Sequence, residues 1–172
     1  MNIFAIEGNE QTGEIDWYKS GRTQDNMRTV KMLLESTQLL SSAMHLNGQV
    51  GPYKLNHAKH PSTLWAAESS DNWRSLYRHA QGLADEYKER FGKEHKCIAI
   101  LQQMIKQVDY TKFSNHNSTP LKLAMPDEFK SSNAVKSYRD YYSTKEKMRY
   151  PKSKIPDWFL KDRKSTRLNS SH

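Results

Sequence analysis

The stretch "DNMRTVKMLLESTQLLSSAM", residues 25–44, constrains the fold more than any other part of the chain. At about 100° per residue, its polar side chains fall within one arc of about 80°, and apolar or small residues cover the rest of the helix. An ordinary surface helix has a much broader polar face. The pattern therefore predicts a long, mostly buried helix over residues 24–46, which ends at the turn-forming pair Asn47-Gly48.

The narrow polar strip of this helix has two interpretations. It contains Arg28, Lys31, Glu35 and Gln38. The strip can be a solvated face with an ion pair between Lys31 and Glu35, four residues apart. Alternatively, it is the floor of a cleft in which a partly desolvated Glu35 has Arg28 and Lys31 to hold its charge. In the second interpretation Glu35, Lys31 and Arg28 are candidate catalytic residues and Gln38 is a candidate substrate contact.

Three further helices are predicted from apolar spacing, over residues 73–91, 94–108 and 133–148. Ser62 or Thr63 can cap an additional helical stretch, and "SSD" at 69–71 offers another cap. Residues 1–6 are expected to form a short strand or an extended segment. The sequence thus predicts an all-α, or mostly α, single compact domain over residues 1–161, with about four helices and long loops.

Composition sets the broad class of protein. The last eleven of the 172 residues, 162–172, resemble a translated sequencing-adapter oligonucleotide, so we exclude them from the fold and expect the natural chain to continue past Lys161. Without them, 24 Lys and Arg oppose 18 Asp and Glu, a net charge of +6. The single cysteine, Cys97, fits a reducing compartment. No apolar run reaches the ~20 residues of a membrane span, so we expect a cytoplasmic protein.

Two histidines, His57 and His60, precede a predicted helix in "NHAKHPSTLW". They could bind a metal if His79, His95 and Glu86 completed the shell. However, there is no HExxH motif and no second ligand pair at fixed spacing. We therefore expect no metal and no cofactor, and we interpret His57 and His60 as hydrogen-bond partners of a phosphate or a base, or of their own loop.

Two further polar residues of the second long helix can face the same cleft. Asn72 and His79 lie seven positions apart, on one face of a helix. This spacing makes them candidate substrate contacts beside Glu35, although either can equally serve the structure.

The segment "YRDYYSTKEKMRYPKSKIPDWF", residues 138–159, alternates aromatic and basic residues. Cations neutralise phosphates, and an aromatic ring can stack on an exposed base for about 1–3 kcal/mol. The pattern makes this segment a candidate nucleic-acid contact, with Tyr138, Arg139, Tyr142, Lys147 and Lys152 as its binding residues. The alternative is that the tyrosines belong to the core and the lysines to an ordinary surface.

Five segments in this order carry a resemblance: "MNIF", "VKMLLESTQLL", "YKLNHAKHPSTLW", "MPDEFK" and "YRDYY". They resemble a group of phage and bacterial proteins that we associate with the pyrimidine-dimer DNA glycosylase (endonuclease V) family. The resemblance implies a small, monomeric helical enzyme that binds damaged duplex DNA, unstacks a base and cuts its N-glycosidic bond.

In that family an N-terminal amine attacks C1′ and forms an imine, and a glutamate on the first long helix supports the reaction. Glu35 matches this glutamate by role, and Arg28 or Lys31 matches the neighbouring cation. The chain departs from the family at position 2. Asn2 is too large for efficient removal of the initiator methionine, so the amine is expected to stay on Met1.

Three functions follow as hypotheses. The first is a DNA N-glycosylase, with or without AP-lyase activity, that acts on a damaged or modified base with Trp65, Tyr138 or Tyr142 stacking on it. The second is a non-catalytic phage nucleic-acid-binding protein. The third is a small nucleotide-processing enzyme in which Lys31, Arg28 and His57 hold a phosphate.

Overall fold

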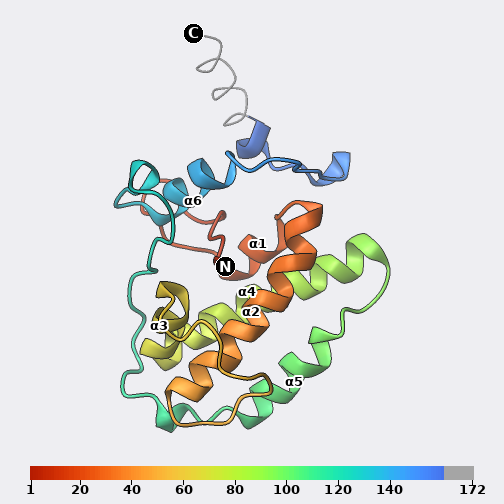
Figure 1. The fold of residues 1–172 in the computed structure, drawn as a ribbon. Helices are drawn as coiled ribbons and strands as arrows, with labels where there is room; N and C mark the ends of the chain where they lie inside the picture. Colours follow the sequence, from red (N-terminus) through yellow and green to blue (C-terminus); the bar gives the residue numbers. More distant parts are fainter. Residues whose placement is uncertain (161–172) are drawn as a thin grey trace.

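The computed structural model describes residues 1–160, which form an all-helical arrangement without a named strand (Figure 1). The adapter-like residues 162–172 lie outside this range. The helices among residues 1–160 are α1 (Trp17–Arg22), α2 (Asn26–Leu46), α3 (Pro61–Glu68), α4 (Ser70–Phe91), α5 (Cys97–Gln107), α6 (Ala134–Tyr142) and three short 3₁₀ helices, η1 (Tyr110–Lys112), η2 (Asp127–Phe129) and η3 (Lys152–Lys154). The all-α class is confirmed, but the expected count of about four helices is wrong, because the short helices α1 and α3 were not counted.

The two longest helices, α2 and α4, pack against each other and form the centre of the core. Helix α2 has almost the predicted bounds, and it ends at Asn47-Gly48 as expected. Helix α4 begins at the predicted cap, where the Ser69 side chain accepts a hydrogen bond from the Asn72 N–H (3.0 Å). It ends at Gly92, whose φ of 72° is the left-handed conformation that glycine adopts without strain.

Helices α3 and α6 differ from the prediction at one end each. The cap of α3 is His60 rather than Ser62 or Thr63, because Pro61 occupies the first helical position. Helix α6 stops at Tyr142 instead of continuing to residue 148. Beyond it the chain turns, and Lys147 adopts a positive φ of 56° that a helix does not allow.

Helix α1 crosses α4 at unusually close range, although it has only six residues. A Cβ on Gly21 would lie 2.3 Å from the His79 carbonyl oxygen, and one on Gly82 would lie 2.1 Å from the Tyr18 carbonyl oxygen. Both glycines are therefore required by backbone contact. The crossing fixes the chain just before α2 begins.

The N-terminal segment is extended and buried, not paired in a sheet. Ile3, Ala5 and Ile6 are fully buried, and the Phe4 ring packs edge-on against Tyr142 with ring centroids 5.1 Å apart. In Figure 1 this segment runs between α6 and the helices below it. It therefore joins α6 to the core formed by α2 and α4.

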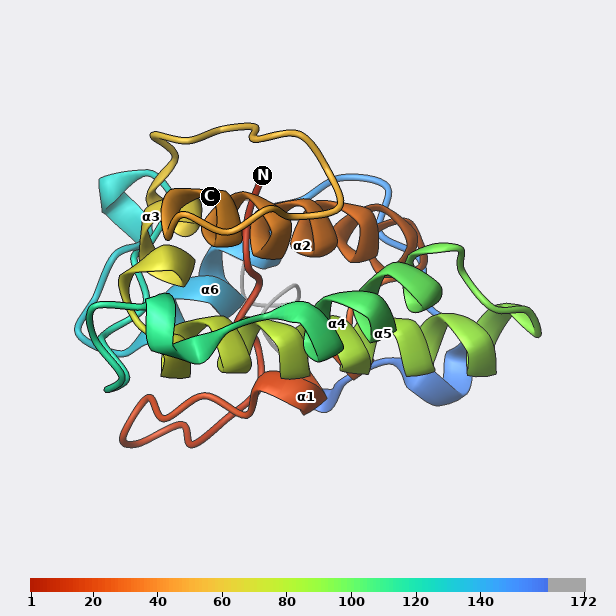
Figure 2. The same ribbon diagram turned by 90° about the horizontal axis from the view of Figure 1, so that it is seen from below.

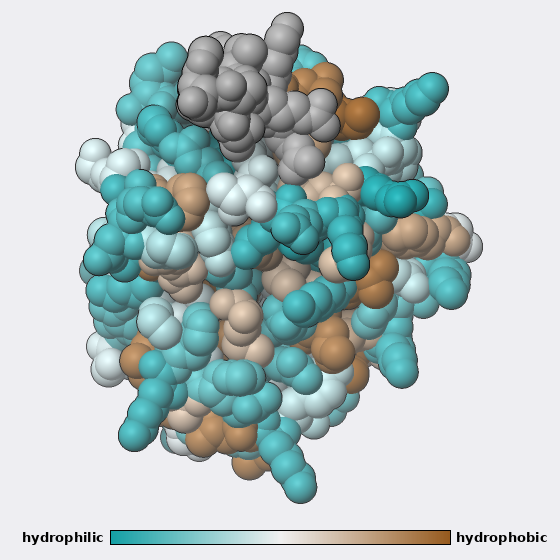
Figure 3. Space-filling view, turned by 45° about the horizontal axis from the view of Figure 1, so that its top comes forward, coloured by the Kyte–Doolittle hydropathy of each residue, from teal (hydrophilic) through white to brown (hydrophobic). Residues whose placement is uncertain are grey.

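The face shown in Figure 3 is mostly hydrophilic, with small, separate hydrophobic patches. Such scattered apolar residues are normal for a protein surface. In the part of the chain that the structure describes, no helix combines the length and the apolar character required to cross a membrane.

Candidate functional site

The charged strip of α2 lies on the outer face of the helix. Lys31 is exposed, whereas Glu35 and Gln38 are only partly buried. The exposed surface is wider than the sequence predicted, because Val30 and Leu34 also reach solvent (40% and 39% exposed). The strip is therefore bordered by accessible apolar side chains on one side.

The partners of the strip differ from both interpretations of the sequence. No salt bridge among residues 1–160 joins Lys31 to Glu35. Arg28 instead pairs with the buried Asp25 (Nη1 to both carboxylate oxygens, 3.2 Å) and lies over the Tyr142 ring (5.7 Å). The expectation that Arg28 holds the charge of Glu35 is thus wrong. The positive charge of Arg28 is neutralised by Asp25, the carboxylate that is nearer to it in the chain.

Glu35 has one oxygen that packing alone does not explain. Its Oε2 is buried and has no hydrogen-bond partner in the structure. A buried acceptor without a partner costs about 1–3 kcal/mol, and more when it is charged. Within residues 1–160 other buried atoms, among them Ser62 Oγ and Thr63 Oγ1, also lack a partner, but Glu35 Oε2 is the one that belongs to a carboxylate.

The loop from residue 47 to residue 60 lies along the outer face of α2. Tyr53 is fixed to α2 by its N–H, which donates to Ser41 Oγ (2.9 Å), and by its carbonyl oxygen, which accepts from His45 Nε2 (2.7 Å). The Asn56 N–H donates to Ser42 Oγ (3.0 Å). Ser42 lies two turns after Glu35 on the same face. The loop therefore brings the residues after Asn56 toward Glu35.

Close approach of this loop depends on Gly51. A Cβ at Gly51 would lie 2.3 Å from Ser41 Oγ and 2.6 Å from the Ser41 carbonyl oxygen. Any other residue would push the loop away from α2.

The two histidines of the loop have unusual local geometry. His57 adopts a positive φ of 51°, which is uncommon outside glycine and clusters at functional sites. His60 caps α3, because its Nδ1 accepts a hydrogen bond from the Ser62 N–H (3.1 Å). The two rings lie 6.4 Å apart, nearly perpendicular. The cap fixes the His60 ring and leaves its Nε2 edge pointing away from α3.

The N-terminus is also held in place. The Asn2 side chain donates to the Ala124 carbonyl oxygen (2.8 Å) and accepts from the Tyr138 hydroxyl (2.9 Å). In Figure 2 the loop between α2 and α3 arches along α2. Met1 itself is only partly buried.

Electrostatic interactions link His60 to the other charged groups around it. The pKa of His60 is lowered, first by burial, then by the positive charges of the Met1 amine and of His57, while the Glu35 carboxylate acts in the opposite direction. The charges of Met1, Glu35 and His57 therefore act on His60, although the four residues come from three separate segments. We call this group the Glu35 site.

Several predicted contacts lie away from the Glu35 site. Asn72 is buried and uses its whole amide on the Trp65 carbonyl oxygen (2.9 Å) and on Thr119 (2.7 and 3.0 Å). His79 is fully buried, where Nδ1 donates to the Trp17 carbonyl oxygen (3.1 Å). Burial lowers the pKa of His79 to about 4. Both are structural residues, and the expectation that they face a substrate is not supported.

The two tyrosines of the 138–159 segment that were predicted to contact a base point inward. Tyr138 and Tyr142 are fully buried, and Trp65, on α3, is 1% exposed. None of these three can stack on a base without opening the core, so they are corrected to core residues. Tyr138 anchors Asn2 and Tyr142 hydrogen-bonds Asp25. Periodicity could not separate a buried ring from an exposed one on so short a helix.

The cations of this segment divide into two groups. Arg139 is mostly buried, where it donates to the Ile6 carbonyl oxygen (2.7 Å) and pairs with Glu7 (3.2 Å) and Glu10 (2.8 Å). It serves the structure, beside a cavity of about 610 Å³ that Glu7 and Trp158 also line. Lys147 and Lys152 are exposed, and a surface contact at these two residues stays a prediction.

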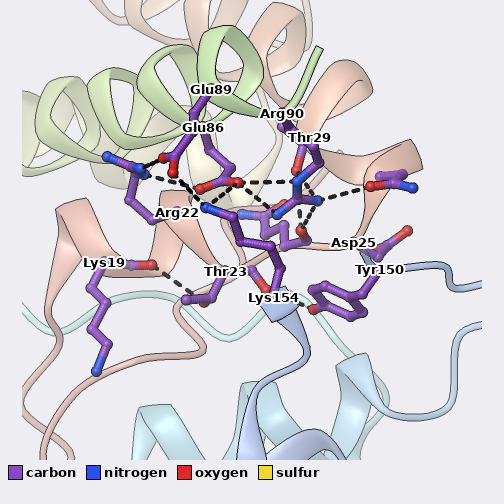
Figure 4. Close-up of polar contacts among 12 residues, drawn as sticks. Lys19, Arg22, Thr23, Asp25, Thr29, Glu86, Glu89, Arg90, Tyr150 and Lys154 are labelled. Atoms are coloured by element: carbon purple, nitrogen blue, oxygen red, sulfur yellow. Dashed lines mark hydrogen bonds and ion pairs between the residues drawn. The ribbon is translucent and has the colours of Figure 1, made fainter. Parts of the chain in front are cut away.

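A second polar cluster, which the sequence did not predict, lies at the C-terminal end of α4 (Figure 4). Glu86 is 1% exposed and receives Arg22 (3.1 Å), Arg90 (3.0 Å) and Lys154 (3.6 Å). Arg90 also donates to the Gln24 carbonyl oxygen (2.7 Å). We call this the Glu86 cluster. It ties the junction of α1 and α2 to α4 and to the C-terminal segment.

The spacing of Glu86 and Arg90, one helical turn apart, was the only available sequence signal for this cluster. The arrangement is unsuited to a metal, because cations already occupy the carboxylate. Within residues 1–160 no group of three or more His, Cys, Asp or Glu side chains could hold a metal ion.

Comparison with known proteins adds no assignment: no protein-family model, no curated protein and no solved structure matches the chain. The candidate function therefore depends on the geometry of the Glu35 site.

Proposed function

We propose that the protein is a DNA N-glycosylase that acts on a damaged or modified base at the Glu35 site. One observation carries the proposal. A carboxylate with a buried, unpartnered oxygen acts on the electrostatics of His60 together with His57 and the N-terminal amine. The resemblance to pyrimidine-dimer glycosylases independently points to a helix glutamate and an N-terminal amine as the reacting groups.

The chemistry fits a carboxylate in this setting. When an N-glycosidic bond breaks, positive charge develops on the sugar ring, and a nearby carboxylate stabilises that charge. Glu35 can also activate the attacking water as a general base. Alternatively, the Met1 amine attacks C1′, as the family resemblance implies, and the resulting imine allows strand cleavage.

Exposed cations around the site suit a DNA backbone. Lys31 lies on α2, Lys54 and Lys59 lie on the loop over it, and Lys122 lies near the Asn2 anchor. Lysine contacts to phosphates give affinity without sequence preference. A base must be unstacked to reach Glu35, at a cost of a few kcal/mol, and these contacts would offset that cost.

The test is base release from short duplexes that carry a pyrimidine dimer, uracil or hypoxanthine, followed by borohydride trapping on an abasic duplex. Base release from one duplex, lost in Glu35→Gln, would support the glycosylase. Peptide mapping of a trapped complex would identify the attached residue as Met1 if the amine reacts. Base release without trapping would assign the attack to water.

A matched control is a variant with two residues added before Met1, which moves the amine but leaves Glu35 in place. It should lose trapping and keep water-dependent base release. Salt-dependent DNA binding without base release from any duplex would overturn the glycosylase in favour of a non-catalytic DNA-binding protein. Absence of DNA binding would favour a nucleotide-processing enzyme.

A further inference from the structure

The protonation state of His60 follows from the way it caps α3. Its Nδ1 accepts a hydrogen bond from the Ser62 N–H (3.1 Å), so Nδ1 carries no proton in this geometry. A neutral imidazole then has its proton on Nε2. His60 therefore presents a fixed N–H donor on the edge of the ring that faces away from α3.

The surroundings of His60 keep it in this form. Burial, the Met1 amine and His57 all lower its pKa, with only Glu35 acting in the opposite direction. Protonation would also place a proton on Nδ1, where it would face the Ser62 N–H and break the cap. Within residues 1–160 no hydrogen bond uses the Nε2 of His60, so this donor is available to a ligand.

We propose that His60 is a catalytic residue that donates a hydrogen bond from Nε2 to the departing base. This inference rests on the proposed glycosylase function. Glu35 would stabilise the positive charge on the sugar, and His60 would stabilise the negative charge on the base. Preorganised donors aimed at developing charge are among the largest contributions to catalysis.

The reaction balances without His60 losing its proton. The bond between C1′ and the base nitrogen breaks, and both electrons leave with the base. Water forms the new bond to C1′, its proton passes to Glu35, and from there it reaches the base anion through solvent. His60 is therefore a neutral electrophilic donor and not a general acid.

Two substitutions separate this donor from the structural cap. In His60→Asn, the side-chain oxygen takes the place of Nδ1 and keeps the cap, but the donor is lost. In His60→Gln, the amide nitrogen reaches the position of Nε2 and keeps a donor, but the cap is weakened. Single-turnover base release should fall about 10²–10³-fold in His60→Asn, the size seen on removal of one such donor, and clearly less in His60→Gln. The melting temperature should be higher in His60→Asn, which keeps the cap, than in His60→Gln, which weakens it.

Binding to an abasic duplex completes the experiment, because that DNA has no base to leave. His60→Asn should bind it with the affinity of the unmodified protein. A matching loss of abasic-duplex affinity would show that His60 contacts the sugar or a phosphate, which overturns the inference while the glycosylase stands. Unchanged base release in His60→Asn would also overturn it. If the unmodified protein releases no base from any duplex, the proposed function fails and the inference with it.

Nitrogen-15 NMR of the unmodified protein should show the Nε2–H tautomer, and an Nδ1–H tautomer would overturn the inference whatever the activity.

Discussion

The Glu35 site and the Glu86 cluster are both built around a glutamate on a long helix, but the two carboxylates differ in the partners that surround them. Glu86 is surrounded by Arg22, Arg90 and Lys154, and its two oxygens are engaged. Glu35 has a buried oxygen with no partner and shares its surroundings with groups that carry or accept protons. A neutralised carboxylate stabilises a structure, whereas one left without partners can interact with a ligand.

The largest expected effect is on turnover at the Glu35 site. Glu35→Gln keeps the shape and volume of the side chain and removes its charge. Base release should fall by about 10²–10⁴-fold, the usual contribution of a carboxylate in acid–base or charge stabilisation. DNA affinity should stay level or rise, because one repulsive charge is removed, and the melting temperature should not fall. Single-turnover kinetics with a binding isotherm measures both, and retained activity would return Glu35 to an ordinary surface role.

The converse result is expected for Glu86→Gln. The change leaves Arg22, Arg90 and Lys154 with uncompensated charge in a buried setting. Breaking one partner of a buried ion pair costs about 3–5 kcal/mol, so the free energy of unfolding in urea should fall by that order. If Glu86→Gln is as stable as the unmodified protein, the Glu86 cluster does not hold the α1–α2 junction and the contrast between the two glutamates fails.

Acid should destabilise the protein through His79, which is fully buried on α4. Its pKa is about 4 in the folded chain against an ordinary value of 6.5, so below pH 6.5 the unfolded chain takes up a proton that the folded chain does not. Stability is fully present above pH 6.5 and is lost as the pH falls to about 4, by about 3 kcal/mol. Urea titrations at pH 7.5 and 4.5 measure this loss. His79→Gln should show a flatter pH dependence, and an equally steep one would assign the effect to other groups.

A local change should separate the loop from the core. In Gly51→Ala the new methyl group meets Ser41, so the loop must shift and His57 and His60 move with it. We expect a loss of about 1–3 kcal/mol from overpacking and a fall in base release, with hydrogen exchange raised in residues 47–60 and unchanged around Glu86. Matched exchange in both regions would mean that the loop and the core unfold together.

The smallest expected effect concerns two exposed lysines. Lys31 lies on the same face as Glu35, whereas Lys19 lies 3.5 Å from Glu7 on another part of the surface. Lys31→Ala should reduce the slope of log Kd against log salt by about one unit for one lost phosphate contact. Lys19→Ala should leave the slope unchanged. The opposite ranking would place DNA away from the Glu35 site.

Much of the helical framework could be predicted from the sequence because helical periodicity is a local property. The bounds of α2, and the cap and end of α4, follow from apolar spacing, from Ser69 and from Gly92. The charged strip that contains Glu35 was visible for the same reason. Helix α1 was missed, because its six residues are specified by contact between Gly21 and α4 rather than by a pattern of their own.

The partners of the charged and aromatic side chains were decided only by the tertiary structure. Sequence spacing suggested Arg28 as the ion-pair partner of Glu35, but Arg28 pairs with Asp25. It also predicted that Tyr138 and Tyr142 can contact a base, but both rings lie in the core. The charges of Met1 and Glu35 act on His60 although some sixty residues separate Met1 from His60 in the chain. Hydrogen bonds and hydrophobic periods within a helix act over one or two turns, so they appear in the sequence. Burial and electrostatic pairing depend on which distant segments pack together, and that is fixed only when the whole chain has folded.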